Sequence, residues 1–213
     1  MISLSMRGLA EVIHTAPAKR VNKLRKYKFK KSGESKGRSN YYVKALSIIK
    51  RHHRGDSAGR DQLLDELKDA LRAAETSAKK AKIRNNIRVA ESYLAVFGKR
   101  QFEVLKGVRL YFTFGSLVVS SQPDLIVQEH GLLKLIKLDC CLKGHPSAET
   151  MTMLHALYLA GRDKALIGHP AQVECLEVAT HASTPGSKSH FSSSKTLENG
   201  CQEIIELWPT VTP

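Results

Sequence analysis

A run of basic residues near the start of the chain could bind phosphate groups. No acid interrupts this run, which consists of Lys19, Arg20, Lys23, Arg25, Lys26, Lys28, Lys30 and Lys31. The whole chain of 213 residues carries a formal net charge of +14. Clustered cations attract nucleic acid because they displace counterions from its phosphates, whatever the base sequence. We therefore expect a nucleic-acid partner, with an acidic protein partner or no specific partner as the alternatives.

The apolar residues and the cysteines do not indicate a membrane or secreted protein. No apolar run reaches the roughly 18 residues needed to span a bilayer, and the basic run lacks the apolar face of an interfacial helix. Arg7 and Glu11 interrupt the apolar residues at the start, which disfavours a secretory signal. The four cysteines are Cys140, Cys141, Cys175 and Cys201. They include no C-x-x-C pair, so we expect reduced thiols and a cytoplasmic protein that does not bind membranes.

The first half of the chain has the apolar spacing of helices. Amphipathic helices are predicted over residues 41–54, 61–74 and 77–97. A Ser/Gly-rich stretch at residues 32–40 precedes them, and Gly98 follows them in the usual position after a helix. This pattern divides the chain into a basic segment over residues 1–40, a helical region over residues 41–98 and an α/β core with a C-terminal helix over residues 99–213.

Strands dominate after Gly98. Extended runs at residues 108–114, 117–127 and 132–140, with turns at Gly115 and Gly131, predict a β-meander. A helix over residues 147–160, a strand over 172–179, a polar loop over 181–196 and a helix over 197–207 are predicted to follow. The order β-β-β-α-β predicts an α+β protein with a mixed sheet.

Two charged residues, Asp124 and Lys137, fall in the second and third predicted strands of this order. The segment GSLVVSSQPDLIVQEHGLLKLIKLD puts Pro123-Asp124 in the second strand and Lys137 in the third. Over roughly residues 104–180 the chain resembles the PD-(D/E)XK nuclease superfamily, in particular its RecB-like branch. In that family the second strand supplies an Asp, the third an acid-x-Lys triplet, and the next helix ends in a tyrosine, which corresponds to Tyr158. The resemblance implies that Asp124 and Lys137 are catalytic residues and that Asp124 binds Mg²⁺ or Mn²⁺.

One position departs from the family pattern. Strand residues alternate between faces, so an acid two residues before Lys137 would share its face. This chain has Leu135 there. Mg²⁺ requires several oxygen ligands, and one carboxylate with one carbonyl makes a poor site. We therefore expect little or no cleavage of nucleic acid in Mg²⁺.

Other residues could complete the metal site. They are Glu91 on the preceding helix, Glu149 on the following helix, Asp139 on the face of Lys137, and His52 or His53 at the end of the helix over residues 41–54. Each also has an ordinary structural interpretation: solvated helix residues, a strand-end residue, and a basic helix terminus.

The expected function is that of a nucleic-acid-binding protein with a RecB-like PD-(D/E)XK core, either catalytically degenerate or a divergent metal-dependent nuclease. The alternative is a protein–protein interaction module that retains the fold. Nucleic acid is favoured if the basic run and Lys137 line one groove. The fold predicts that Asp124 and Lys137 lie on adjacent antiparallel strands, on one face and within about 8 Å of each other.

Overall fold

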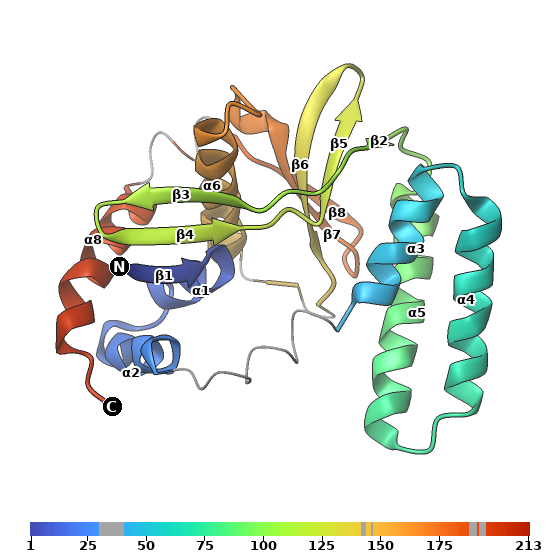
Figure 1. Ribbon diagram of the computed structural model, residues 1–213, viewed down its shortest axis with the longest axis horizontal. Coiled ribbons are helices and arrows are strands. Elements are labelled where there is room, and N and C mark those ends of the chain that lie inside the picture. The colour runs from blue at the N-terminus through green and yellow to red at the C-terminus, as the bar shows by residue number, and fades with distance from the viewer. Residues whose placement is uncertain (30–40, 142–143, 146, 188–190, 192–194) are drawn as a thin grey trace.

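The protein has an α+β fold in which helices cover both faces of a mixed sheet (Figure 1). The computed structural model describes residues 1–213 apart from residues 30–40, 142–143, 146, 188–190 and 192–194. The strands are β1 (Ile2–Ser5), β2 (Glu103–Val104), β3 (Leu110–Phe114), β4 (Leu117–Ser121), β5 (Leu125–Glu129), β6 (Leu132–Asp139), β7 (Val173–Glu177) and β8 (Ala182–Pro185). The helices are α1 (Met6–Ile13), α2 (Pro17–Lys28), α3 (Val43–His53), α4 (Ser57–Arg72), α5 (Ser77–Phe97), α6 (Ser147–Asp163) and α8 (Thr196–Leu207), with short 3-10 turns η2 (Pro170–Gln172) and η3 (Trp208–Thr210).

The larger sheet has the strand order β2-β5-β6-β7-β8. Its centre is the β5–β6 hairpin, whose two turn residues, His130 and Gly131, have positive φ angles of 50° and 77°. Two such residues form a type I′ turn, which suits the right-handed twist of paired strands. The predicted turn at Gly131 is therefore confirmed. Helix α6 then returns the chain so that β7 runs parallel to β6.

The predicted three-stranded meander is wrong in one respect. The long run expected over residues 117–127 breaks into β4 and β5, which belong to different sheets. Pro123 lies in the break, and because proline has no N–H it cannot continue a strand ladder there. Strand β4 pairs with β3 and, in parallel, with β1, whereas β5 pairs with β6 and β2.

The first elements of the chain, β1 and α1, belong to the core. Strand β1 pairs with β4, and α1 packs against α6 and α8. Ser5 caps α1 by accepting a hydrogen bond from the Gly8 N–H at 3.1 Å. Six of the eight residues of α1 are buried, which explains why this helix is fixed to the rest of the molecule.

Helices α3, α4 and α5 form an antiparallel group at one end of the molecule (Figure 1). All three predicted helices are found: α5 has the predicted bounds, and the ends of α3 and α4 are shifted by a few residues. Asn86 is buried in α5 and joins α5 to the start of α3, because its side chain accepts from the Ala45 N–H at 3.0 Å and donates to the Tyr41 carbonyl at 2.8 Å. The polar loop predicted over residues 181–196 contains the edge strand β8.

Two apolar cores lie on opposite faces of the β5–β6–β7 part of the sheet. One contains Ile126, Leu135 and Cys175 and joins α1, α6 and α8 to the sheet. The other contains Ile136 and Leu138 and joins α3 and α5 to the sheet. The alternation of strand side chains thus assigns each residue of β6 to one of two helical layers.

Candidate functional site

Asp124 and Lys137 meet at the edge where β5 begins and β6 ends. The register that pairs Leu125 with Ile136 places Asp124 opposite Lys137, and the Lys137 Nζ lies 2.8 Å from the Asp124 Oδ2. The same oxygen accepts the Leu138 N–H at 2.9 Å. Both side chains are partly exposed, at 16% for Asp124 and 26% for Lys137. The predicted cross-strand placement on one face is confirmed.

Leu135 shares this face but lies in the apolar core. It is fully buried, and a Cβ on Gly161 of α6 would lie only 2.7 Å from its Cδ1 atom. The face therefore has an apolar contact with α6 where the resemblance requires a carboxylate. The Asp124 oxygen is already bonded by Lys137 and by the Leu138 N–H. This donor set does not fit a Mg²⁺ or Mn²⁺ ion, which requires several free oxygen ligands.

Three of the residues suggested as substitutes lie elsewhere or bind other groups. Glu91 is exposed on α5, and its carboxylate is 3.9 Å from Lys68 of α4, away from the sheet. His53 lies in the second core, where its Nε2 is 2.9 Å from the Tyr93 hydroxyl and burial lowers its pKa to about 4. His52 binds the Gly98 carbonyl at 2.8 Å. These histidines and Glu91 are structural residues of the helical group and not ligands at Asp124.

The fourth suggestion, Asp139, does lie on the face of Lys137. It is 5% exposed and forms a cluster with Cys141 and His145. Its Oδ2 is 2.8 Å from the His145 Nδ1, and its Oδ1 accepts the Cys141 N–H at 2.9 Å. Burial raises the pKa of Asp139, but hydrogen bonds from His145 and Cys141 outweigh burial and hold it below its ordinary value. Glu149, in the first turn of α6, is near enough for its charge to help raise the pKa of His145, after the larger effect of Asp139.

The sequence carries a signal for this cluster that the predictions from C-x-x-C spacing do not include. Asp139, Cys141 and His145 follow the spacing D-x-C-x-x-x-H directly after a strand. A search for C-x-x-C pairs overlooks it because the ligand types are mixed.

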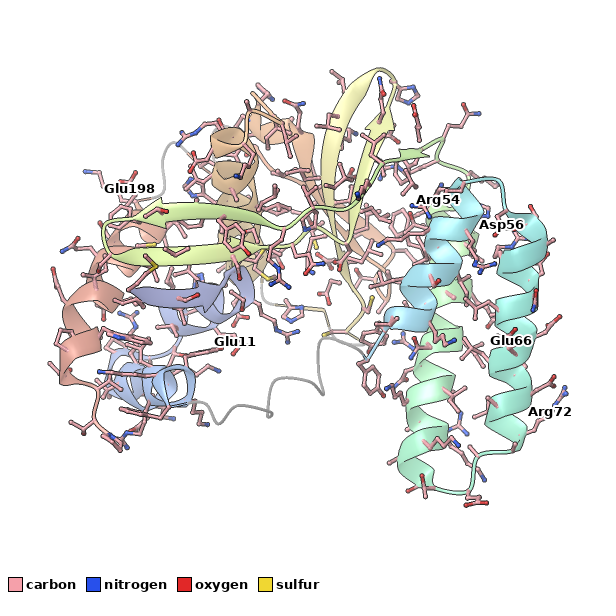
Figure 2. All side chains as sticks on the ribbon, in the orientation of Figure 1. Glu11, Arg54, Asp56, Glu66, Arg72 and Glu198 are labelled. Atoms are coloured by element: carbon pink, nitrogen blue, oxygen red, sulfur yellow. The ribbon has the colours of Figure 1, made fainter. Side chains whose placement is uncertain are left out.

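The basic run of α2 is mostly engaged within the protein. Arg20 donates to the Ile13 and Thr15 carbonyls, each at 2.9 Å, and pairs with Glu203. Lys23 is 2.7 Å from Glu11, which Figure 2 labels on α1.

Of the other described cations of the basic run, two bind main-chain carbonyls and two are exposed. Arg25 donates to the Thr212 carbonyl at 2.7 Å, and Lys28 donates to the Trp208 and Val211 carbonyls at 2.7 and 2.9 Å. Lys19 and Lys26 are exposed. Lys30 and Lys31 lie outside the described residues. Four of the six described cations of this run thus contact α1, α8 or the C-terminal segment, whereas Lys137 lies on β6.

A second set of cations lies along α5. Residues 77–90 contain five basic residues and no acid. Lys80, Arg84 and Arg88 are spaced by four residues, so they form one stripe on the helix. Arg88 donates to the Cys140 carbonyl at 3.4 Å, which places the end of the stripe at the end of β6. Its Nε is buried and has no hydrogen-bond partner among the described residues.

An aromatic residue lies beside Lys82, a cation of α5 that is not part of this stripe. The Lys82 Nζ is 5.9 Å from the ring centre of Tyr41, and the Tyr41 hydroxyl accepts a hydrogen bond from Asn85 at 2.9 Å. Tyr41 and Tyr42 pack edge to face at the start of α3. Cations next to aromatic rings are typical of surfaces that bind single-stranded nucleic acid, because bases stack on the rings.

A pocket lies at the opposite end of the β5–β6 hairpin. It is lined by residues of the α3–α4 connection and of the segment from α5 to β2, and by Gly131. Arg54, at the end of α3, faces β2 from the helical group (Figure 2). The pocket does not include Asp124 or Lys137, so it is not part of the site that the resemblance implies.

Comparison with models of known protein families gives no match, and comparison with curated proteins gives none either. In the part of the chain that the structure describes, no helix combines the length and the apolar character needed to cross a membrane.

Proposed function

We propose that this protein binds nucleic acid through the cation stripe of α5 and carries a RecB-like PD-(D/E)XK core that does not cleave phosphodiester bonds. The observation that supports binding is the position of Lys80, Arg84 and Arg88. The stripe begins in an exposed part of α5 and ends at the Cys140 carbonyl, next to the Asp139 cluster.

The charge of this stripe is uncompensated within the described residues. None of its three cations forms an ion pair with a described acid, in contrast to Arg20 and Lys23 of α2. A cation that already pairs with a carboxylate gains less from a phosphate, because it must first give up that partner. The α5 stripe is therefore a better phosphate-binding surface than the basic run at residues 19–28.

The nuclease-like part of the proposal rests on the Asp124–Lys137 pair in the β5–β6 hairpin, which α6 and the parallel strand β7 follow. The lack of cleavage rests on Leu135, which is buried against α6. Without a second carboxylate, the site lacks the negative charge that holds Mg²⁺ against its hydration shell.

The test is fluorescence anisotropy with labelled single-stranded DNA, duplex DNA and RNA over a salt series. We expect binding at low salt that weakens steeply as salt rises. A variant with Lys80→Gln, Arg84→Gln and Arg88→Gln should reduce the log–log salt slope on duplex DNA by about 2 to 3, since each lost phosphate contact removes about 0.9. Incubation of plasmid DNA with the natural protein and Mg²⁺ should give no cleavage.

A matched control removes three exposed cations from other surfaces, Lys106→Gln, Arg109→Gln and Lys164→Gln. Both variants lose the same net charge, so a general charge effect would weaken binding equally in both. Equal loss, or no binding by the natural protein at 50 mM salt, contradicts the proposal. If the natural protein cleaves DNA in Mg²⁺ and the Asp124→Ala variant does not, the proposal that the site is inactive is wrong.

A protein–protein interaction module is the second candidate. The internal bonds of Arg20, Arg25 and Lys28 favour it, because they remove most of the basic run from a phosphate-binding role. It predicts the absence of binding in the same anisotropy assay.

A further inference from the structure

Three side chains of different metal-binding types meet at the end of β6. They are the carboxylate of Asp139, the thiol of Cys141 and the imidazole of His145, and one ligand atom from each lies within 4.8 Å of the others. A tetrahedral Zn²⁺ ion, with bonds of about 2.0 Å to nitrogen or oxygen and 2.3 Å to sulfur, separates its ligand atoms by about 3.3 to 3.6 Å. The cluster would close on such an ion with side-chain movements of roughly 1 Å.

The backbone holds these side chains in place. Asp139 is the last residue of β6, and its carbonyl accepts the Val178 N–H at 2.9 Å. The Cys141 N–H donates to the Asp139 carboxylate at 2.9 Å. Gly144 has a φ of +66°, a conformation that favours glycine, and the chain turns there so that His145 returns to Asp139. The close approach thus depends on main-chain geometry as well as on side-chain rotamers.

A further carboxylate borders the cluster. Glu177 of β7 is opposite Asp139 in the parallel β6–β7 pair. A Cβ on Gly144 would lie 3.6 Å from the Glu177 Oε2 and 3.9 Å from the Asp139 Oδ2, so both carboxylates face the same glycine. The Glu177 Oε2 accepts a hydrogen bond from the Thr180 hydroxyl at 2.8 Å, so Glu177 would give up this bond to become a fourth ligand.

The geometry points to a transition-metal site in which Asp139, Cys141 and His145 bind Zn²⁺, with Glu177 or a water molecule as the fourth ligand. A thiolate and an imidazole suit Zn²⁺ and related ions, whereas Mg²⁺ prefers oxygen ligands alone. The bound ion would fix the chain after β6 to the sheet, next to the contact between Arg88 and the Cys140 carbonyl. This site is separate from nucleic-acid binding and does not depend on it.

An alternative role for these residues is a catalytic pair, with Cys141 as the nucleophile and His145 as its base. The His145 Nδ1 faces Asp139 and the Nε2 lies 3.9 Å from the Cys141 Sγ. Burial and then the charge of Asp139 raise the pKa of the Cys141 thiol, which is the opposite of what activates a nucleophile. A metal ion bound by the Cys141 sulfur would stabilise the thiolate despite the burial and the charge of Asp139, because a coordinating thiol is deprotonated.

The test uses the full chain, stripped of metal with a chelator and titrated with Co²⁺ as a spectroscopic probe for Zn²⁺. We expect about one ion per chain, as for a single tetrahedral site, with a thiolate-to-cobalt charge-transfer band and strong visible bands. Added Zn²⁺ should displace Co²⁺ and remove these bands. Cys141→Ser should remove the charge-transfer band, and His145→Asn should abolish stoichiometric binding.

Cys140→Ala is the matched control, because Cys140 is the adjacent residue and its sulfur is outside the cluster. It should keep the full Co²⁺ spectrum. Circular dichroism establishes that each variant is folded. The site is refuted if the natural protein gives no thiolate-to-cobalt band, a result that does not depend on the folding of any variant. It is equally refuted if folded Cys141→Ser retains the band or folded Cys140→Ala loses it.

Discussion

Leu135 decides what the Asp124–Lys137 face can do. Its side chain is fully buried, with Gly161 of α6 directly against it. A carboxylate at this position would lose its hydration and would not reach solvent without moving α6. The leucine therefore serves helix–sheet packing, and placing an acid here is not a simple way to create a metal site.

We predict that Leu135→Glu destabilises the protein and does not create a nuclease. The change removes buried apolar contacts and buries an ionisable group, and together these should lower the free energy of unfolding by more than about 3 kcal/mol. Urea denaturation followed by circular dichroism would measure this.

Leu132→Glu is the control, because Leu132 is on the same strand and 57% exposed. It should change the free energy of unfolding by less than about 0.5 kcal/mol. A stable Leu135→Glu protein that cuts DNA in Mg²⁺ would show that the position can supply a ligand.

At the scale of the element, the charged residues of helix α2 have partners that the sequence around them does not indicate. Its basic residues have few acidic neighbours in the sequence, yet four of them bind groups from α1 or the C-terminal segment. Figure 1 shows α2 beside the C-terminal end of the chain, far from it in sequence. Most of these partners are main-chain carbonyls, which carry no signature in the amino-acid sequence. The helix acts as a clamp on the C-terminus.

We predict that Lys28→Gln and Arg20→Gln each lower the free energy of unfolding by about 1.5 to 3 kcal/mol, the range for hydrogen bonds to charged groups. Both side chains bind main-chain carbonyls, which lose a charged donor when the residue is replaced. Lys26→Gln, at an exposed position of the same helix, should change it by less than about 0.5 kcal/mol. Thermal and urea unfolding would measure all three. Equal effects of Lys26→Gln and Lys28→Gln on the free energy of unfolding would show that the bonds from α2 to the C-terminal segment do not stabilise the protein.

At the scale of the whole molecule, a buried ionic network joins the helical group to the sheet. Arg100, which follows α5, donates to Glu129 of β5 at 2.7 and 2.8 Å and to Glu174 of β7 at 2.8 and 2.9 Å. Lys134 of β6 is 2.6 Å from Glu129. Both carboxylates are 6% exposed. The hydrogen bond from Arg100, followed by the smaller effects of Lys134, lowers the pKa of Glu129 from its ordinary 4.5 to about 2.

This network predicts the acid sensitivity of the fold. A carboxyl group whose pKa is lower in the folded state stabilises the protein above its unfolded pKa, and the contribution is lost as pH falls through the folded pKa. For Glu129 this window extends from about 4.5 down to about 2. We expect the free energy of unfolding to fall by about 2 to 3 kcal/mol across it on account of this residue.

Urea denaturation at a series of pH values would test this. Glu129→Gln should be less stable at neutral pH and should lose less stability in acid than the natural protein. Glu103→Gln, at an exposed position on the neighbouring strand β2, should leave the pH dependence unchanged. An unchanged acid response in Glu129→Gln would exclude this network as its source.

The sequence by itself determined the local elements and part of the candidate site. Apolar spacing gave α3, α4, α5, α6 and α8, because a helix must bury one stripe whatever it packs against. Alternation and the turn at Gly131 gave the β5–β6 hairpin, and its register follows from a two-residue turn, so Asp124 and Lys137 could be placed opposite each other.

The tertiary structure alone decided what the charged residues contact. The pairing of β1 with β4, the break at Pro123 and the clamp of α2 on the C-terminus all join segments far apart in the chain. Local propensity does not encode such contacts, because they depend on which surfaces remain to be buried once the elements have formed.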